Sequence, residues 1–378
     1  MKQIPKFSFG VGDRFAQEGV NQLSALLKAS ELYGREFAPV WNKSNREHTI
    51  IGTTPKSTRQ EADEAVAKVG YKGEYFCDAD HISMKNVDMF IEHCDFFTLD
   101  VADYIRKAST PEEKYSLAIA KAGELYRYIA AAKGEGNFVT EVSMDEVDEA
   151  QTPEDIRYIL TEIAKEKIPV QTFAPKFTGR FNKGVDYVGD VSVFAKEFEE
   201  DILVLKWAVE KLGLPENLKL SVHSGSDKFS IYPIIGELIR KHDVGVHIKT
   251  AGTTWLEELI GLALSGGKAL ELAKRIYAGA LARKEELSAP YATVIDIDEN
   301  KLPSVDAVNA WSKDEFARAL RHEQSDELYN PSFRQLMHVS FKIAAELGNE
   351  FITALRDNAA IIGEQITANI SERHIRRL

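Results

Sequence analysis

The chain has 378 residues, of which 44% are hydrophobic and 28% are charged. This length and balance are typical of one large globular domain with an extension, or of two ordinary domains, and they exclude a disordered or fibrous protein. The net charge of -12, from 47 Lys and Arg against 59 Asp and Glu, argues against binding to a nucleic-acid backbone.

Targeting and membrane signals are missing from the sequence. Residues 1–6 lack an apolar run of signal-peptide length, and no stretch approaches the roughly 20 apolar residues of a membrane span. Two cysteines, Cys77 and Cys94, are too few for a disulfide framework and are typical of core thiols in a reducing compartment. These features predict a cytoplasmic protein with neither a membrane nor a nucleic-acid partner.

The expected elements alternate between strand and helix from the start of the chain. The first strand ends in glycines followed by Asp13 and Arg14, but the third glycine of the dinucleotide fingerprint is missing, so a nucleotide site is not favoured. Polar or charged side chains also follow the later strands. Strands are expected at residues 7–14, 37–41, 75–77, 95–100, 137–143, 170–177, 218–223 and 244–252.

Two of these strands carry strong signals for metal binding or acid–base chemistry. The third runs directly into Asp78, Asp80 and His81, three metal-competent side chains within four residues. Glu141 lies inside the fifth strand, where burying a carboxylate is costly unless it is paired or bound to a metal. The alternatives are an aspartate that caps the next helix and a glutamate on a solvated edge.

The seventh and eighth strands each carry a histidine near the strand end, with a lysine close behind. His223 opens a polar loop, and His247 shares one face of the eighth strand with its lysine by the period of two. A strand histidine is more often a satisfied core residue than a ligand, but two such strands in succession favour a site. The groups that follow these histidines are Ser226, Asp227, Lys228 and Lys249.

Eight strand signals separated by helices predict an α/β fold, a (β/α)8 TIM barrel over residues 1–264, with its chemistry on the loops after the strands. An open doubly wound sheet is the structural competitor, because eight alternating units do not prove closure. Residues 265–378 are predicted to be a helical C-terminal extension packed on the barrel. In that extension Arg334 and His338 lie one helical turn apart and could reach back over the barrel mouth. The loop after the sixth strand carries Lys176, Arg180 and Lys183, and it could neutralise a carboxylate or phosphate on a substrate, with Arg180 as the candidate contact, or its cations could simply be solvated.

Several short motifs occur in a fixed order along most of the chain: Gly10–Arg14, Asp78–His81, Phe97–Asp100, Glu141–Ser143, Lys183–Tyr187, His223–Phe229, His247–Thr253 and Arg334–Val339. In these motifs the chain resembles the tagaturonate/fructuronate epimerases, metal-dependent barrel enzymes of bacterial uronate breakdown. That family usually has an additional N-terminal segment, whereas the first strand is expected here almost at Met1, and Asp103-Tyr104 stands where the family would have an Asp-His pair.

The resemblance implies an isomerase that interconverts tagaturonate and fructuronate with a divalent cation: manganese, nickel, cobalt, iron or zinc. The carbon that is inverted lies β to the ketone, so the carbonyl cannot assist direct removal of its proton. A retro-aldol cleavage followed by recombination would invert it, through an enediolate stabilised by the ion.

On this basis we expect His81, His223 and His247 to bind the cation, and Asp80 and Glu141 to act as the general acid/base pair. A Schiff base at the eighth-strand lysine is conceivable, but it leaves the histidines without a purpose. Expected contacts to the sugar-acid substrate are Asp13, Arg14, Arg180, Ser226, Asp227, Lys228, Lys249, Arg334 and His338.

Two other functions stay open at this point. One is a related metal-dependent ketose epimerase, isomerase or class II-type aldolase that acts on another sugar or sugar acid. The other is a barrel that binds a sugar acid without catalysis. The sequence identifies neither the metal nor the oligomeric state.

Overall fold

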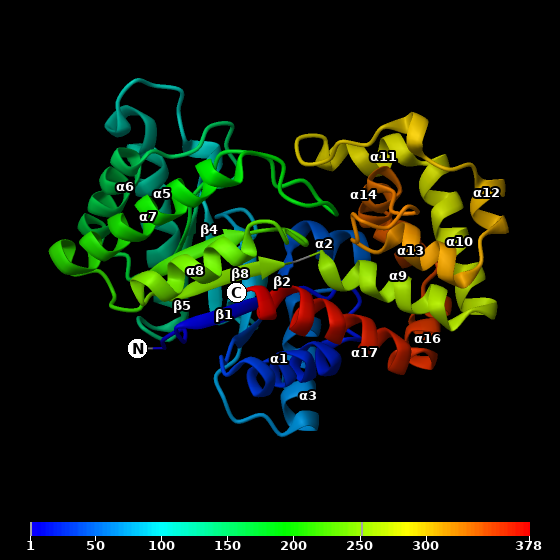
Figure 1. Cartoon of the computed structure of the whole chain (residues 1–378). Coiled ribbons are helices and arrows are strands. Elements are labelled where there is room, and N and C mark those ends of the chain that lie inside the picture. Colours follow the sequence, from blue (N-terminus) through cyan, green and yellow to red (C-terminus); the bar gives the residue numbers. More distant parts are fainter. Residues whose placement is uncertain (1, 251) are drawn as a thin grey trace.

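The structure is a computed structural model that describes residues 2–250 and 252–378. Eight parallel strands form a closed barrel, in which each strand pairs with the next and β1 pairs with β8 (Figure 1). This closure confirms the predicted barrel and excludes the open sheet. The strands are β1 Phe7–Val11, β2 Ala38–Ser44, β3 Phe76–Ile82, β4 Phe96–Asp100, β5 Val139–Ser143, β6 Val170–Ala174, β7 Lys219–His223 and β8 Val246–Thr250.

The helices that follow the strands surround the barrel. Local signals set several of their ends: Thr152 accepts a hydrogen bond from the backbone N–H of Asp155, and Pro153 occupies the first helical turn. These helices are α1 Gly19–Tyr33, α2 Asn45–Ile51, α3 Pro55–Val69, α4 Asp88–Ile91, α5 Pro111–Lys133, α6 Pro153–Lys165, α7 Val191–Leu212, α8 Tyr232–His242 and α9 Thr253–Ser265.

The last part of the chain is mostly helical, and α10 to α16 lie to one side of the barrel, on the right in Figure 1, whereas the C-terminal end returns to the barrel. Its final long helix, α17, runs back to pack against α9 and α1. The division into two domains at residue 264 stays a prediction. The helices here are α10 Gly267–Ala282, α11 Lys284–Ser288, α12 Val305–Ala310, α13 Lys313–Leu320, α14 Pro331–Val339, α15 Phe341–Glu346, α16 Asn349–Asp357 and α17 Ala359–Thr367.

Apolar side chains fill the space between strands and helices and also the floor of the barrel. Cys77 and Cys94 are both buried free thiols, as the composition predicted. Alternate residues of a barrel strand point inward, and those nearest the strand starts form a separate apolar cluster inside the barrel. This floor cluster consists of Ile4, Ala38, Val40, Phe76, Phe96 and Val139.

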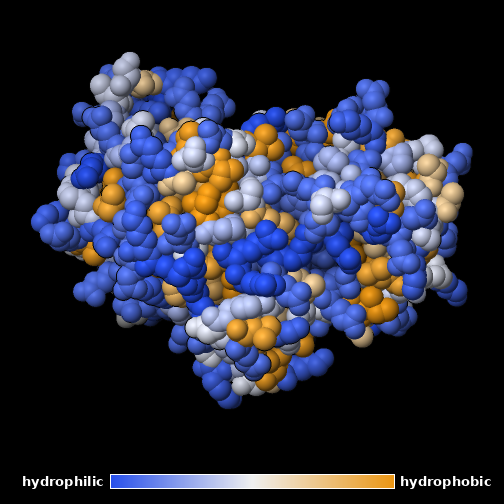
Figure 2. All heavy atoms as spheres, in the orientation of Figure 1, coloured by the Kyte–Doolittle hydropathy of each residue, from blue (hydrophilic) through white to orange (hydrophobic). Residues whose placement is uncertain are grey.

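The outer surface is mostly hydrophilic, with separate apolar patches rather than one continuous band (Figure 2). Few large apolar side chains are exposed among the described residues. They are spread over α1, α5 and α7 and the loops before α4 and α7. In the described part of the chain, no helix combines the length and the apolar character needed to cross a membrane.

Candidate active site

The inward-facing residues change from apolar to charged as the strands approach their carboxyl ends. Two positions beyond the floor residues Phe76, Phe96 and Val139 stand Asp78, Thr98 and Glu141, all fully buried. Charged groups in such an enclosed position require partners. The partners of these groups are one another and a lysine from β8. A layer of charged and hydrogen-bonded side chains therefore lies just below the barrel mouth.

His81 enters the mouth because the end of β3 is irregular. The pairing of β3 with β4 shifts register between Ala79 and Ile82, and the backbone of His81 has a left-handed φ of 52°. In a regular strand Asp80 and His81 would point to opposite faces. The irregularity brings both side chains to the mouth. A non-glycine residue in the left-handed region is strained, and such strain is often found at functional positions.

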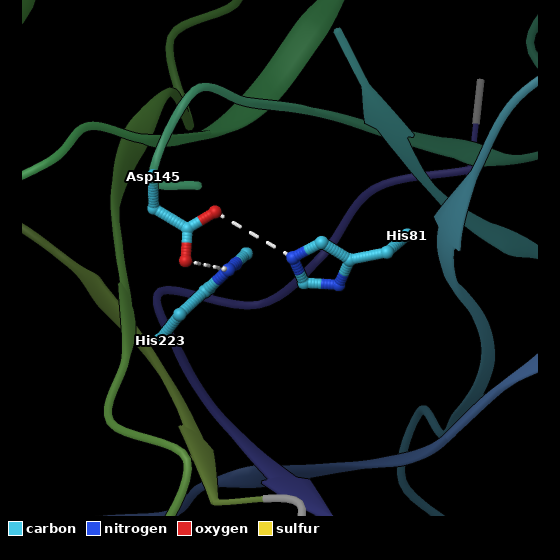
Figure 3. A group of neighbouring side chains, drawn as sticks. All are labelled: His81, Asp145 and His223. Carbon is cyan, nitrogen blue, oxygen red and sulfur yellow. Dashed lines mark hydrogen bonds and ion pairs between the residues drawn. The ribbon is translucent and has the colours of Figure 1, made fainter. Parts of the chain in front are cut away.

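His81, Asp145 and His223 form the group that can hold a metal ion among the described residues, with one potential ligand atom of each within 4.8 Å of the others (Figure 3). The Oδ2 of Asp145 lies 3.1 Å from Nδ1 of His223, and its Oδ1 lies 3.5 Å from Nε2 of His81. Two imidazoles and one carboxylate from three different strand ends leave positions of an ion open for other ligands.

Each imidazole also contacts a buried carboxylate through its other nitrogen. Nδ1 of His81 lies 2.7 Å from Asp80 and Nε2 of His223 lies 2.8 Å from Glu141. Such a carboxylate fixes the ring orientation and tautomer of a metal-binding histidine. Asp80 and Glu141, expected to be an acid/base pair, therefore lie directly behind the two histidines.

The same carboxylates control the protonation of the imidazoles. Burial lowers the pKa of both histidines, but Asp80 and Asp145 raise the pKa of His81 well above its ordinary value. Asp145 and Glu141 likewise raise the pKa of His223 to about 9. The neighbouring carboxylates thus keep the two imidazoles protonated. A metal ion that binds an imidazole nitrogen would displace the proton from that nitrogen.

Lys249 ties this layer together from β8. Its Nζ lies 2.7 Å from both Asp78 and Asp80, 3.4 Å from Glu141, and donates to the hydroxyl of Thr98 at 2.9 Å. Burial opposes the charge, but the three carboxylates raise the pKa of Lys249 well above its ordinary value. A lysine held as an ammonium is a poor Schiff-base nucleophile, which weighs against that route.

His247 is not part of the metal-binding group. It points into the barrel one layer below Lys249, with its ring 5.4 Å from that of Phe96 and its Nδ1 2.9 Å from the hydroxyl of Ser8. Burial lowers the pKa of His247 to about 3. The ligand set expected from the sequence therefore differs from the geometry at this position, because alternation put His247 inside the barrel but too close to its floor.

The sequence model of the UxaE family, described as tagaturonate epimerase, matches residues 2–115 and 110–378, which together are nearly the whole chain. The chain belongs to the UxaE tagaturonate epimerase family. This membership makes it an isomerase-class epimerase and confirms the resemblance found in the sequence.

Individual members of the epimerase family agree with this assignment. The tagaturonate/fructuronate epimerase of Thermotoga maritima is 27% identical over 419 aligned residues, covering 97% of this chain and 80% of that protein. A crystal structure of the fructuronate-tagaturonate epimerase UxaE from Cohnella laeviribosi shares the fold, with a TM-score of 0.83 at 22% identity, over 100% of this chain and 83% of that one. A probable tagatose 6 phosphate kinase from Sinorhizobium meliloti is a more distant fold match, with a TM-score of 0.52 at 11% identity.

Four residues expected to contact substrate instead form a buried joint behind the mouth. Arg334 Nη2 lies 2.8 Å from Asp227, and both side chains are fully buried. Lys228 donates to the backbone carbonyls of Asn182 and Val185, and Ser226 accepts a hydrogen bond from the N–H of Gly184. These side chains therefore hold backbone rather than line an open site.

Of the remaining expected contacts, Asp13 and Arg180 lie away from the metal-binding group, whereas Arg14 is buried near His338. Asp13 accepts hydrogen bonds from four successive backbone N–H groups ahead of α1, and Arg180 is exposed in an ion pair with Asp296, so neither faces the metal-binding group. Arg14 is buried against Glu47, with its Nη1 3.4 Å from the carbonyl of His338.

His338 is fully buried among cations at the mouth. Neither of its ring nitrogens has a hydrogen-bond partner among the described residues. Burial and the charges of Arg14 and Lys183 hold its pKa well below the ordinary value, so the ring is neutral. The backbone of Gly252 passes so close that a Cβ there would lie 2.1 Å from Nε2 of His338.

Asp145 is the site residue that sequence reasoning passed over. It follows β5 by two positions, and its Oδ1 accepts a hydrogen bond from the hydroxyl of Ser143, the last residue of that strand. Its position in the sequence could have indicated this role, because an acidic residue just beyond a strand end lies at the face where barrel enzymes carry their catalytic residues.

Two of the cavities formed by the described residues lie at opposite ends of the barrel. A small hollow of about 30 Å³ beside the metal-binding group is lined by Asp145, His223 and Lys176, together with apolar residues. A larger one of about 570 Å³ lies where the strands begin, between Phe7, Arg35 and Arg240. None of the expected site residues lines the larger cavity, so its size alone does not mark the active site.

Proposed function

We propose that this chain interconverts tagaturonate and fructuronate with a divalent cation, acting on the small-molecule sugar acid at the carboxyl end of the barrel. The observation that carries the proposal is the His81–Asp145–His223 group, backed by carboxylates that a buried lysine neutralises, in a member of this epimerase family. The cytoplasmic location predicted from the sequence is part of the same proposal.

His81, Asp145 and His223 would hold the cation. Their fit is supported by Nε2 of His81, which is buried, has no hydrogen-bond partner among the described residues and faces Asp145. Two nitrogens and one oxygen suit zinc, manganese, cobalt, nickel or iron. When bound, such an ion supplies Lewis-acid stabilisation of negative charge on a substrate oxygen.

The reaction that fits this site is a retro-aldol cleavage and its reversal. A base takes the proton of the hydroxyl on the carbon to be inverted, and the bond from that carbon to the carbon α to the ketone breaks. The bonding electrons become those of an enediolate, and the other half leaves as an aldehyde. Rotation of the aldehyde and re-formation of the bond on its other face, with return of the proton, give the epimer.

Asp80 is the better placed of the two predicted proton carriers. Its side chain retains 9% exposure at the mouth, whereas that of Glu141 retains none. Burial alone would raise the pKa of Asp80, but Lys249 and His81 hold it well below the ordinary value, so it is ionised. Its position at the mouth, with its side chain partly exposed, makes it the proposed base. Glu141 acts as a positioning residue for His223 and Lys249.

The test is a proton NMR time course of metal-stripped protein with tagaturonate, before and after addition of manganese, nickel or zinc. Fructuronate is expected only after an ion is added, and not in His223→Ala. Accumulation of free three-carbon products would indicate an aldolase instead. Binding without conversion under every ion would indicate a non-catalytic sugar-acid-binding protein.

A further inference from the structure

A cation on the loop between β6 and α7 stands out from the other buried lysines. This loop leaves the barrel and extends toward α14 (Figure 1). It carries Lys183, whose side chain is partly buried. Among the described residues Lys183 has no ion-pair partner within 4 Å, whereas Lys249 on the neighbouring barrel wall has three carboxylates.

The other enclosed cations are already satisfied. Lys43, Lys219 and Lys228 each donate to backbone carbonyls. Arg14, which like Lys183 is an enclosed cation near His338, forms an ion pair with Glu47 at 3.1 Å. A partly buried ammonium that lacks both kinds of partner is poised to accept an anion from outside the chain.

The backbone that carries Lys183 is held firmly on both sides. The N–H of Lys183 donates to the carbonyl of Val294 at 2.7 Å, and the next N–H, of Gly184, donates to the hydroxyl of Ser226 at 2.9 Å. Arg334 Nε donates to the carbonyl of Gly184 at 2.5 Å, and Lys228 donates to the carbonyls that flank the pair. The buried joint therefore fixes where the Lys183 side chain begins.

Lys183 lies at the mouth, close to the loop that leaves the metal-binding group. A Cβ on Gly225, two residues after His223, would stand 3.8 Å from its Nζ. The ammonium also lies 5.6 Å from the centre of the Tyr291 ring, which covers it from the C-terminal region. Burial lowers the pKa of Lys183, and the charges of Glu146 and Asp80 act on it in the opposite direction.

We propose that Lys183 binds the carboxylate of the sugar-acid substrate and gives the site its preference for a sugar acid over a neutral ketose. This inference rests on the proposed function. The sequence indicated the loop after the sixth strand as a cationic one that could neutralise a substrate carboxylate, with Arg180 as the expected contact, and the geometry points to Lys183 instead. The neutral ring of His338, enclosed by the same cations, adds an uncharged polar surface beside this position.

The position of the carboxylate has a consequence for the retro-aldol step. Cleavage leaves the ketone carbons on the enediolate half, while the carboxylate stays on the aldehyde half. An ammonium bound to that carboxylate holds the aldehyde in the site while its carbonyl turns to present its other face. Without this contact, the aldehyde can escape before the bond forms again.

The experiment compares Lys183→Gln and Lys183→Met with the wild-type holoenzyme. We expect each variant to raise KM for tagaturonate about 10- to 100-fold, the loss typical of a hydrogen bond between charged groups. Free three-carbon aldehyde, trapped as a hydrazone, should also appear during turnover. Inhibition by gluconate should weaken by a similar factor, while inhibition by sorbitol, its neutral counterpart, should stay unchanged.

Three further variants make the result decisive. Lys183→Arg should restore most of the affinity for gluconate, and Lys196→Gln, an exposed lysine on α7, should behave as wild type. The inference would be overturned if KM and gluconate inhibition stayed unchanged in Lys183→Gln and Lys183→Met, or if inhibition by gluconate and by sorbitol weakened equally. It would also be overturned if only Lys176→Gln showed the gluconate-specific loss of inhibition. A wild-type protein that does not convert tagaturonate would instead refute the proposed function.

Discussion

Single residues in this site take their properties from the charges around them. Lys249 keeps its proton because three carboxylates surround it, and Asp80 and Glu141 stay ionised because of Lys249 and the histidines. Asp78, in the same layer, has its pKa raised to about 6 because burial outweighs its share of that ammonium. Removing one member therefore changes the protonation of all the others.

Lys249→Met tests this coupling. We expect a loss of about 3 to 5 kcal/mol in the free energy of unfolding at pH 7, because three buried carboxylates lose their counter-charge. Without the ammonium their folded pKa values rise above the unfolded ones, so the stability lost at pH 7 is regained as the pH falls. Urea unfolding at pH 7 and pH 5 measures both effects. A difference from wild type that is the same at both pH values would contradict this account.

The metal-binding group is tested by affinities measured on single-residue variants. His223→Ala should abolish binding of zinc to the stripped protein, and Asp80→Asn should weaken it about 10- to 100-fold, because the orienting partner of His81 is altered.

The matched variant for this series is His247→Gln. The structure places this residue a layer below the group, with its Nδ1 against the hydroxyl of Ser8, so it neither binds the ion nor orients a ligand, and zinc affinity should stay close to that of wild type. Isothermal titration supplies all three numbers. A loss as large as that of His223→Ala would return His247 to the ligand set.

At the scale of elements, the decisive contact joins the loop after β7 to the C-terminal helices. Asp227 receives Arg334 from α14 and stands 3.4 Å from His322 and 3.5 Å from His374. Burial would raise the pKa of Asp227, but His322 and Arg334 hold it well below the ordinary value. The loop that follows His223 is thus anchored by residues far away in the sequence.

Asp227→Asn should lower the free energy of unfolding at pH 7 by about 3 to 5 kcal/mol, because Arg334 keeps its charge in a buried position. A carboxyl group with a depressed folded pKa stabilises the protein above its unfolded pKa of about 3.9, and this contribution is lost as the pH falls through the folded value. The gap between wild type and variant should therefore narrow below about pH 4. Asp243→Asn, an exposed control, should leave stability nearly unchanged.

At the scale of the whole molecule, the proposed binding of a cation would be linked to folding. An ion that binds only the folded chain adds about 2.7 kcal/mol of stability at a hundredfold excess over its Kd. In the metal-free protein the raised pKa of His223 contributes stability that is complete below an unfolded pKa of about 6.5 and is lost as the pH rises through about 9.

Thermal unfolding with and without zinc at pH 6 and pH 8 tests this linkage. The ion competes with protons on the histidines, so its stabilising effect should be larger at pH 8, with affinity rising up to about tenfold per pH unit for each proton released. In His223→Ala the zinc-induced shift should disappear. An equal shift at both pH values in wild type would show that binding releases no protons.

The sequence alone determined the alternation of strands and helices, and with it the barrel and the face that carries the chemistry. Periodicity and caps are local properties, and the words around Asp80, His81 and His223 identify the family without any geometry. Asp145 and Lys183 were visible as charged residues after strands, but their neighbours were not.

Only the tertiary structure decided which side chains meet. The alternation of strand residues predicts that His247 and Lys249 both face into the barrel. His247, however, lies beside Phe96 at the floor, and only Lys249, two residues later, reaches the carboxylates. The irregular end of β3 turned His81 toward Asp145. Distances between residues more than sixty positions apart depend on barrel closure and register, which no local pattern of residues encodes.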